Sequence, residues 1–520
     1  MPNSTFNTLK NRIPGLRCLL RLPGQLCGTN PFQGDCLPRR VPLIFAKGRP
    51  ALPFPHPWNY QEPIRILETY FHGADAESGG ARHNRFLDFP GFPPVLVTRD
   101  PAIIRAITTN SGDGAGQFDR DTLPSSGIAR STGKDTLLYS NGALWRHQRK
   151  LAAPPFGKTT LFQPEIFHEF AETFRTTVRT RLLALETFLR QTDQSRAQIS
   201  LEPEIKAVML EMLTNNFFGT AVPYQELRDR FVPALDRLIS HIVRDTVTNR
   251  LGLPLSVAPA WLSRRIAQAK TDNAAFNELT DSVLATRHEA KGLWKQFRSD
   301  APDAALRSNI KVFLAGALEA TTSYATWAIS HLARNPDLQE RVYSEVRDLE
   351  DYSPDALERA VWLRSTLDET LRLTPSLYFL PRQASVDTWV ETSDKRRMLI
   401  PQGTHILLDV WHANRHEDFW GIARTGYPAD QFAPERWQYI MEHGGASKDF
   451  LHFGFGHGPR VCPGKHLGQL EVALVTGALV KLFRFRAVNP ELSVRAGVST
   501  KPADGTLVEL EVRAATANGI

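Results

Sequence analysis

The segment with the clearest chemical potential is FGFGHGPRVCPG, which runs from Phe453 to Gly464 and contains Cys462. Its four glycines and two prolines predict an irregular loop, because both residue types interrupt regular structure. An amphipathic helix is predicted directly afterwards, over Lys465 to Leu482. The unpaired N–H groups at the start of that helix and the charge of Arg460 favour a thiolate. We therefore expect the loop to bring backbone close to a flat ligand and Cys462 to bind a soft metal centre.

The alternative for Cys462 is a buried small residue without a chemical role, which is the usual situation of an isolated cysteine. The other cysteines, Cys18, Cys27 and Cys36, lie in an N-terminal stretch that contains proline and glycine. They could form a metal or redox site, but no histidine lies among them and no CxxC pair occurs. Zinc ligation is therefore unsupported, and the low cysteine content fits a reducing compartment better than a secreted disulfide framework.

The elements that must position the loop are predicted to be mainly helices. Helical periodicity dominates from Trp145 to about Arg334, and the run from Pro93 to Ile107 predicts a strand followed by a helix after Asp100-Pro101. Further strands are predicted at Trp389–Glu391, Met398–Ile400, Ile406–Val410 and Leu507–Val512. The segment from Asn110 to Gly142, rich in Gly, Ser, Asp and Thr, predicts a long loop. The fold class is therefore mainly α with a smaller β region.

A second pattern, ETLR, places Glu369 and Arg372 three residues apart on a predicted helix, and hence on one face of it. A carboxylate paired with a guanidinium, reinforced by Arg436 from the segment FAPER, could pin this helix against the cysteine loop. Such a cluster would be scaffold rather than chemistry. The alternative is a surface ion pair of little energetic value.

The cysteine loop resembles the haem-binding signature FxxGxRxCxG of the cytochromes P-450. The matching positions are Phe455, Gly458, Arg460, Cys462 and Gly464. The chain is similar to that family also at its ExxR pair, at the FAPER segment and at the WxxxR pattern of WRHQR, and ordered matches run from about Pro50 to the C-terminus. The resemblance implies a cytochrome P-450-like fold and a haem b (iron protoporphyrin IX) whose iron is bound by Cys462, with Phe455 among the haem contacts.

The two haem propionates require cations and hydrogen-bond donors, and the resemblance nominates Trp145, Arg149, Arg382 and Arg460 for that role. Arginine suits carboxylates because its planar fork binds them in a bidentate manner. For Arg149 the alternative is a solvated helix face in the basic run RHQRK. With Lys150 and Lys465 the same run could form a positive face that docks an acidic electron donor.

The helix predicted from Lys311 to Ile329 resembles the family's central distal helix with its (A/G)Gx(D/E)TT motif, but the match is imperfect. Placing Glu319 at the acid position puts Ala320 where the proton-relay threonine is usual, and leaves Thr321 and Thr322 beyond it. Proton delivery would then come from Thr321 after a helix bulge, from ordered water or from a substrate hydroxyl. The alternative for both threonines is hydrogen bonding to their own backbone.

The resemblance implies a monooxygenase that inserts one oxygen atom from O2 into an apolar or amphipathic organic substrate. Electrons from NAD(P)H would arrive through a separate reductase or ferredoxin, because the roughly 60 residues after Cys462 cannot hold a reductase. Substrate contacts are expected from 110–142, 231–262, the distal helix and 376–380. The replacement at Ala320 supports a second possibility, an enzyme that uses peroxide or rearranges an oxygenated substrate. Outside enzymology the alternative is a haem sensor or carrier.

Length and composition fit one large catalytic domain, predicted over 49–520 after a basic leader over 1–48. The leader has no acidic residue before Asp35, as in mitochondrial transit peptides, although a cytoplasmic protein is the first expectation. The net charge of +7 over 520 residues suggests an acidic protein partner or a membrane surface and no nucleic acid. No apolar run near 20 residues occurs, so no transmembrane anchor is predicted and only peripheral membrane contact is expected.

Overall fold

A computed structural model describes the chain mainly between residues 63 and 513. The described ranges are 63–71, 80–88, 95–112, 117–121, 126–152, 154–191, 196–248, 254–286, 303–349, 352–443 and 452–513, together with 39–40, 44–46, 49–51, 76 and 293. Most of the predicted leader, including Cys18, Cys27 and Cys36, lies outside these residues, and the division into leader and domain stays a prediction. Within them the chain is mainly α-helical with small sheets, which confirms the predicted fold class.

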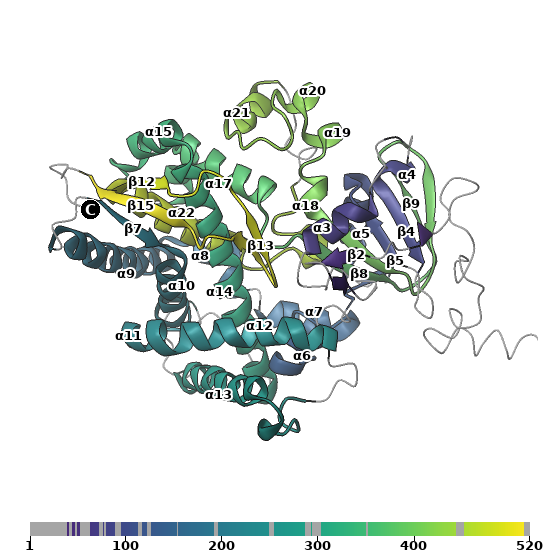
Figure 1. The fold of residues 1–520 in the computed structure, drawn as a ribbon, viewed down its shortest axis with the longest axis horizontal. Coiled ribbons are helices and arrows are strands. Elements are labelled where there is room, and N and C mark those ends of the chain that lie inside the picture. The colour runs from purple at the N-terminus through teal and green to yellow at the C-terminus, as the bar shows by residue number, and fades with distance from the viewer. Residues whose placement is uncertain are drawn as a thin grey trace, which may run out of the picture.

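A six-stranded sheet lies on the right in Figure 1, with the strand order β1-β4-β5-β11-β8-β6. These strands are β1 (Arg39–Arg40), β4 (Asn84–Asp88), β5 (Val95–Thr98), β11 (His405–Asp409), β8 (Phe379–Ala384) and β6 (Phe118–Asp119). β8 pairs antiparallel with both β11 and β6, and Asp119 lies opposite Gln383. The pairing therefore places Arg120, which follows β6, close to Arg382 on β8.

Helix α14 (Asp303–Ala333) passes through the middle of the molecule (Figure 1) and contains the predicted distal helix. It contacts α10 (Glu202–Glu211), α13 (Arg264–Ala285), α17 (Val361–Leu373) and α22 (Lys465–Leu482). Its apolar residues are spread around the whole circumference, as in helices enclosed by others. Every residue from Thr322 to Ala333 is buried, so α14 is the core against which the other helices pack.

Smaller β elements surround this helical core. β9 (Thr388–Glu391) and β10 (Arg397–Ile400) form a hairpin, and β12 (Phe483–Ala487), β15 (Leu507–Val512) and β7 (Arg196–Ser200) form a three-stranded sheet. A second hairpin joins β13 (Val494–Ala496) to β14 (Thr500–Pro502) and reaches α14, where Ser323 Oγ donates to the carbonyl of Thr500 at 2.6 Å. This contact brings the hairpin side chains alongside the distal helix.

The remaining elements complete the outer layers of the fold. The helices are α3 (Pro63–Tyr70), α4 (Gly80–His83), α5 (Pro101–Thr109), α6 (Ser126–Thr132), α7 (Gly142–Ala152), α8 (Lys158–Leu161), α9 (Pro164–Gln191), α11 (Tyr224–Glu226), α12 (Val232–Thr248), α15 (Pro336–Val346), α16 (Pro354–Arg359), α18 (Val410–Ala413), α19 (Glu417–Trp420), α20 (Ile422–Thr425) and α21 (Glu435–Glu442); the strands β2 (Ile44–Ala46) and β3 (Arg49–Ala51) pair with each other. No helix in the described part of the chain has the length and apolar content needed to cross a membrane.

Several element predictions are confirmed, and one is wrong. The strand and helix predicted from Pro93 to Ile107 are β5 and α5, and Asp100 caps α5 by accepting hydrogen bonds from the backbone N–H groups of Ala102 and Ile103. The helix predicted over Lys465 to Leu482 is α22. The long loop predicted over 110–142 instead contains β6 and α6. The polar sequence of α6 is a poor helix former, and its packing against α12 stabilises it.

Candidate functional site

The loop that carries Cys462 is closed by its own backbone hydrogen bonds. The backbone N–H of Cys462 donates to the carbonyl of Phe455 at 2.9 Å, and that of Gly456 donates to Phe453 at 2.8 Å. Gly458 has a φ of +71°, and a Cβ added there would lie 2.3 Å from the carbonyl oxygen of Thr108. Only glycine fits this approach to α5, and the tight packing holds Cys462 directly before α22.

The side chain of Cys462 is accessible although protein atoms crowd around it. Burial raises the pKa of the thiol, against the opposing effects of the Gly464 backbone N–H, Arg149 and Lys465. The preference of the loop for a thiolate stays a prediction, which the Gly464 N–H, Arg149 and Lys465 favour and burial opposes. A metal ion at the sulfur would supply the missing positive charge, since metal ligation deprotonates a thiol.

Arg149 lies beside the cysteine loop. Its Nη1 donates to the carbonyl oxygen of Val461 at 2.9 Å, and burial lowers the pKa of its guanidinium while the nearby thiol raises it. The other helix residues on the exposed side of α7 include Arg146, His147 and Lys150, and α7 contains no acid. A basic surface therefore adjoins the loop, as the sequence predicts.

Three arginines cluster on the sheet side of the loop, where Asp119 acts on Arg460 and Asp121 acts on Arg120. Arg382 is 3% exposed, and its Nε donates to Ser111 Oγ at 3.1 Å. Burial first, and then the charges of Arg120 and Arg460, lower the pKa of Arg382. Burial and Arg120 also lower the pKa of Arg460 to about 10. The buried Nε atoms of Arg120 and Arg460 have no hydrogen-bond partner within the described residues.

Trp145 supports this cluster from α7. The guanidinium carbon of Arg460 lies 4.5 Å from the centroid of the Trp145 ring, a cation–π distance, and its Nη2 donates to Asn141 Oδ1 at 2.6 Å. Mutually repelling, desolvated cations destabilise a fold unless an anion neutralises them. The donor set therefore fits a ligand that carries carboxylates.

The surface of α14 is accessible along one stripe of small residues. Gly316, Ala317, Ala320 and Thr321 are accessible, whereas Leu318 and Glu319 between them are buried. A Cβ added to Gly316 has no atom within 4 Å, so the space beside it is open. The spacing of i and i+4 puts these residues on one face of the helix. That face can receive a flat group or a substrate without steric hindrance.

Thr321 lies at the end of this stripe that approaches the cysteine loop. A Cβ added to Gly468 of α22 would lie 3.7 Å from Thr321 Cγ2 and 3.9 Å from Phe455 Cε1, so these residues meet around Gly468. The hydroxyl of Thr321 donates to the carbonyl of Ala317 at 2.8 Å. Hydrogen bonding to the helix backbone is the predicted alternative to a role of Thr321 in proton delivery. α14 is helical throughout this region, so the proposed bulge is not seen. No bulge is needed, because Thr321 already lies on the accessible face.

Glu319 lies on the buried side of α14 and is held by cations. Its Oε2 accepts hydrogen bonds from Lys501 Nζ at 2.8 Å and from Ser499 Oγ at 2.9 Å, and Lys206 Nζ lies 3.4 Å from Oε1. Lys501 and Lys206 lower the pKa of Glu319 to about 2 although burial opposes them. The role of Glu319 as the acid stays a prediction, and in this structure its carboxylate is ionised and paired.

The predicted Glu369–Arg372–Arg436 cluster is fully buried and complete. Glu369 accepts two hydrogen bonds of 2.8 Å from Arg372, and Arg436 Nε lies 3.3 Å from Glu369 Oε1. Arg372 also donates to the carbonyls of Asn414, Ala429 and Gln431. Asn414 in turn donates to the carbonyl of His452, immediately before the cysteine loop. The cluster is therefore the predicted scaffold, and the surface-pair alternative is wrong.

A sequence model of the family described as Cytochrome P450 matches residues 86–507. The chain belongs to the cytochrome P450 family. It is 25% identical over 420 residues to a cytokinin hydroxylase of Arabidopsis thaliana, covering 77% of this chain and 75% of the relative. It is 27% identical over 448 residues to cytochrome P450 734A2 of Oryza sativa subsp. japonica, covering 78% and 74%. It is also 27% identical over 266 residues to geraniol 8-hydroxylase of Catharanthus roseus, covering 49% of each.

Membership makes the chain a haem-thiolate monooxygenase, an oxidoreductase that uses haem and O2. The residues present fit haem b: Cys462 offers an accessible sulfur, and two propionates would bring acceptors to arginines that repel one another and leave buried Nε atoms without a hydrogen-bond partner within the described residues. When bound, a thiolate-ligated haem supplies the power to cleave the O–O bond. The protein's part is to hold this group, exclude water and position substrate and protons.

Sequence reasoning missed Arg120. The residue stands in the run FDRDT, which has the composition of a solvated loop, and no local pattern indicates that β6 pairs with β8. Its backbone is fixed by Asn141, whose side chain accepts from the N–H of Arg120 at 2.9 Å and donates to its carbonyl at 3.1 Å. The structure thus adds Arg120 to the predicted set of Trp145, Arg149, Arg382 and Arg460.

Proposed function

We propose that this cytochrome P450 inserts one oxygen atom from O2 into an apolar or amphipathic organic molecule. The observation that carries the proposal is the accessible stripe of Gly316, Ala317, Ala320 and Thr321 on the otherwise buried α14. Small side chains leave room for a substrate above the haem-binding residues, and their apolar character favours apolar surface. Two relatives are named as hydroxylases, which supports the same class of reaction.

The segment that follows α17 supports an apolar substrate. Leu377 is 41% exposed although Ser376 and Tyr378 on either side of it are buried, and Phe379 is partly accessible. Ser376 Oγ donates to the carbonyl of Ala320 at 3.0 Å, so this segment lies against the accessible stripe. We infer that Leu377 contacts the substrate, and that its accessible surface is covered when substrate binds.

Thr321 is the side chain that we assign to proton delivery. Its hydroxyl lies on the accessible face of α14, where it needs only to exchange its hydrogen bond to Ala317 for one to a water or a substrate. Glu319 and Lys501 form a charged chain on the opposite side that continues to Glu202 and Arg495. Arg495 is exposed, so this chain links the interior of α14 to solvent.

We infer that electrons from NAD(P)H arrive through a separate acidic reductase or ferredoxin. Arg146 and Lys150 are exposed on α7, and Lys158 is exposed at the start of α8, next to the loop of Cys462. A surface of one charge steers a partner of opposite charge and makes the association sensitive to salt. Cytochrome P450 turnover by this chain is therefore expected to fall as the ionic strength rises.

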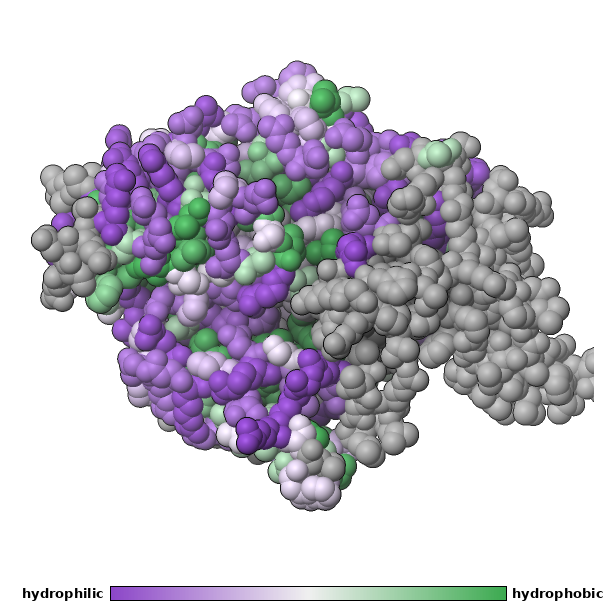
Figure 2. Space-filling view, in the orientation of Figure 1, coloured by the Kyte–Doolittle hydropathy of each residue, from purple (hydrophilic) through white to green (hydrophobic). Residues whose placement is uncertain are grey.

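We propose a cytoplasmic location with peripheral membrane contact, and a mitochondrial location as the alternative. The tip between α12 and α13, at the bottom of Figure 2, carries pale and green residues, and Val257 and Trp261 there are 60% and 83% exposed. Arg264 and Arg265 follow directly, the arrangement of a segment that inserts apolar side chains between anionic headgroups. Subcellular fractionation of the unmodified chain tests the location, and the same fractionation of Trp261→Ser tests the membrane contact.

Ala320 supports a second type of reaction. Ala320 lies on the accessible stripe, and its side chain carries no proton donor. This favours an enzyme that uses peroxide or rearranges an oxygenated substrate, and such an enzyme needs no reductase. A haem sensor or carrier is the alternative outside enzymology. The proposed monooxygenase requires an electron donor, whereas the peroxide-using or rearranging enzyme does not.

The deciding experiment is turnover of the purified haem-loaded chain with a panel of apolar compounds, first selected by their shift of the haem spin state. The proposal predicts isotopically labelled oxygen in the product only with O2, NAD(P)H and a redox partner. Product formed with hydrogen peroxide and no donor would favour the second reaction. Absence of any spin-state shift across the panel would contradict both and favour a sensor or carrier.

A further inference from the structure

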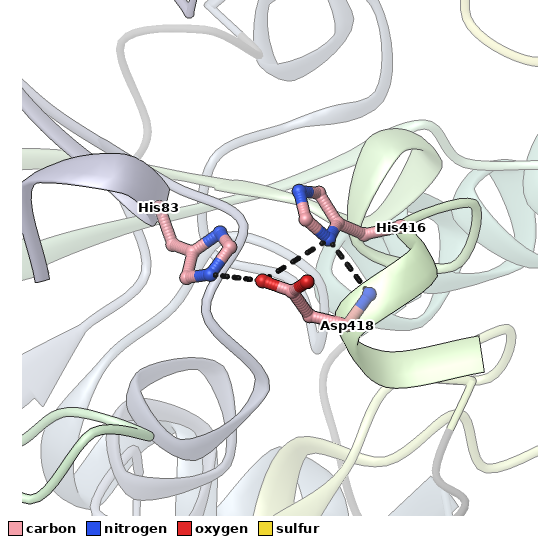
Figure 3. Close-up of side chains that lie close together, drawn as sticks. All are labelled: His83, His416 and Asp418. Carbon is pink, nitrogen blue, oxygen red and sulfur yellow. Dashed lines mark hydrogen bonds and ion pairs between the residues drawn. The ribbon is translucent and has the colours of Figure 1, made fainter. Parts of the chain in front are cut away.

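Two histidines and an aspartate converge where α4 meets α19 (Figure 3). His83 is the last residue of α4 and leads directly into β4 of the large sheet. His416 caps the start of α19, and Asp418 lies in its first turn. The three side chains thus come from segments far apart in the sequence, and all three ligand atoms lie within 4.8 Å of one another.

The distances between these atoms suit a small metal ion. His83 Nε2 lies 3.1 Å and His416 Nδ1 lies 3.8 Å from the same carboxylate oxygen of Asp418. Ligands at about 2.0–2.1 Å in a tetrahedron are about 3.4 Å from one another. These two separations lie on either side of that value and the nitrogens of the two histidines lie within 4.8 Å of each other, so side-chain shifts would complete three corners of a tetrahedron.

We propose that His83, His416 and Asp418 bind one divalent transition-metal ion of the zinc class, separate from the haem iron. Two imidazoles and one carboxylate are ligands that Zn²⁺ accepts, whereas Ca²⁺ and Mg²⁺ prefer oxygen alone. Asp418 is 35% exposed, so water can reach the fourth corner.

Both histidines face Asp418 through a ring nitrogen, His83 through Nε2 and His416 through Nδ1. His416 Nδ1 accepts a hydrogen bond of 3.2 Å from the backbone N–H of Asp418, so a metal ion at this nitrogen would take over the lone pair that now caps α19. The second nitrogen of His83, Nδ1, is buried and has no hydrogen-bond partner within the described residues.

Two cations oppose a metal ion: Arg82, whose Nη1 lies 3.0 Å from the same oxygen of Asp418, and Arg99, whose charge acts on His83. The side chains of Arg82 and Asp418 are 33% and 35% exposed, and ion pairs of this exposure contribute little. Phe419 packs against both imidazoles, with ring centroids 4.9 Å from His83 and 5.3 Å from His416, and restricts their motion. A bound ion would fasten the large sheet to the segment that the Glu369 cluster holds, and so stabilise the fold.

The test uses the full-length holoenzyme, stripped with a chelator, equilibrated with ZnCl2 and passed through a desalting column. Zinc is then measured relative to haem iron. We expect His83→Ala and His416→Ala to retain one zinc ion per chain fewer than the unmodified protein, and Asp418→Asn to bind at least tenfold more weakly. His443→Ala removes an exposed histidine of the same region and should leave zinc unchanged. Haem content and the carbon monoxide spectrum show that each variant is folded.

Because Cys18, Cys27 and Cys36 are also zinc ligands in principle, a second measurement assigns the ion without a variant. Zinc X-ray absorption of the unmodified holoenzyme should show nitrogen and oxygen ligands at about 2.0–2.1 Å with imidazole scattering. Zinc content that is equal in all variants would overturn the proposal, as would an ion with only sulfur ligands at about 2.3 Å.

Discussion

Lys501 Nζ lies 2.8 Å from Oε2 of Glu319, so a lysine from the β14 strand neutralises the carboxylate next to the accessible stripe of α14. Lys206 of α10 approaches the other carboxylate oxygen at 3.4 Å. A carboxylate held between two ammonium groups stays ionised at neutral pH and cannot itself donate a proton. Any proton that moves along the charged chain around Glu319 must therefore come from Lys501, Lys206 or water.

The low pKa of Glu319 links stability to acid. Its folded pKa of about 2 is below the ordinary value of 4.5, so the ion pairs stabilise the fold fully above about pH 4.5, and the gain is lost as the pH falls towards 2. We expect Glu319→Gln to lose on the order of 3 kcal/mol at pH 7 and to lose less at pH 3. Urea unfolding of both chains across this range checks the difference, and parallel curves would contradict it.

Thr321 should control how efficiently O2 is used. Thr321→Ala removes the hydroxyl on the accessible face and should lower product formed per O2 consumed by about 10²-fold, with the spin-state shift on substrate binding retained. Thr321→Ser should keep most of the coupling. Thr322→Ala is the matched control, because the Thr322 hydroxyl is buried away from the stripe. Equal coupling in Thr321→Ala and Thr322→Ala would remove Thr321 from proton delivery.

The Glu369 cluster should be essential for folding rather than for chemistry. Glu369→Gln leaves Arg372 and Arg436 as uncompensated buried charges, and breaking such a pair costs about 3–5 kcal/mol. We expect little haem-loaded protein and a lower Tm. Glu391→Gln, which breaks the exposed pair with Lys395, should change the Tm very little. A fully loaded Glu369→Gln protein with normal stability would show that the cluster is not a scaffold.

The arginine cluster predicts effects of opposite sign with and without haem. Arg120→Met removes one of three mutually repelling cations, so the haem-free protein should be no less stable than the unmodified one. In the holoenzyme the same change removes a charged hydrogen bond worth about 1.5–3 kcal/mol, or about 10- to 100-fold in haem retention. Haem transfer to a scavenging apoprotein measures the retention, with Arg146→Met on the exposed face of α7 as the control. Faster haem loss in both variants would argue against a specific role.

Local patterns in the sequence predict the parts of this site that are contiguous. The signature around Cys462, the ExxR pair and the boundaries of α22 are each specified by residues within one or two turns of one another. Arg120 and the partners of Glu319 could not be found this way, because β6–β8 pairing and the β13–β14 hairpin bring them in from distant segments. β8 was missed because Pro381 lies within it, opposite Leu407, and proline normally argues against a central strand.

The pKa of Cys462 shows the same limit of sequence reasoning. The Gly464 N–H, Arg149 and Lys465 act to lower the pKa of the thiol, and burial by the surrounding protein acts to raise it. The extent of burial depends on how α7, α14 and α22 pack around the loop, and no local pattern reports it.

The central claim is that Cys462 binds the haem iron as a thiolate, and the carbon monoxide difference spectrum of the dithionite-reduced protein tests it most directly. The unmodified haem-loaded protein should show a strongly red-shifted Soret band, and Cys462→Ser should lose that band while retaining protein fold by circular dichroism. Absence of the band in the unmodified haem-loaded protein, or its persistence in Cys462→Ser, would contradict the account.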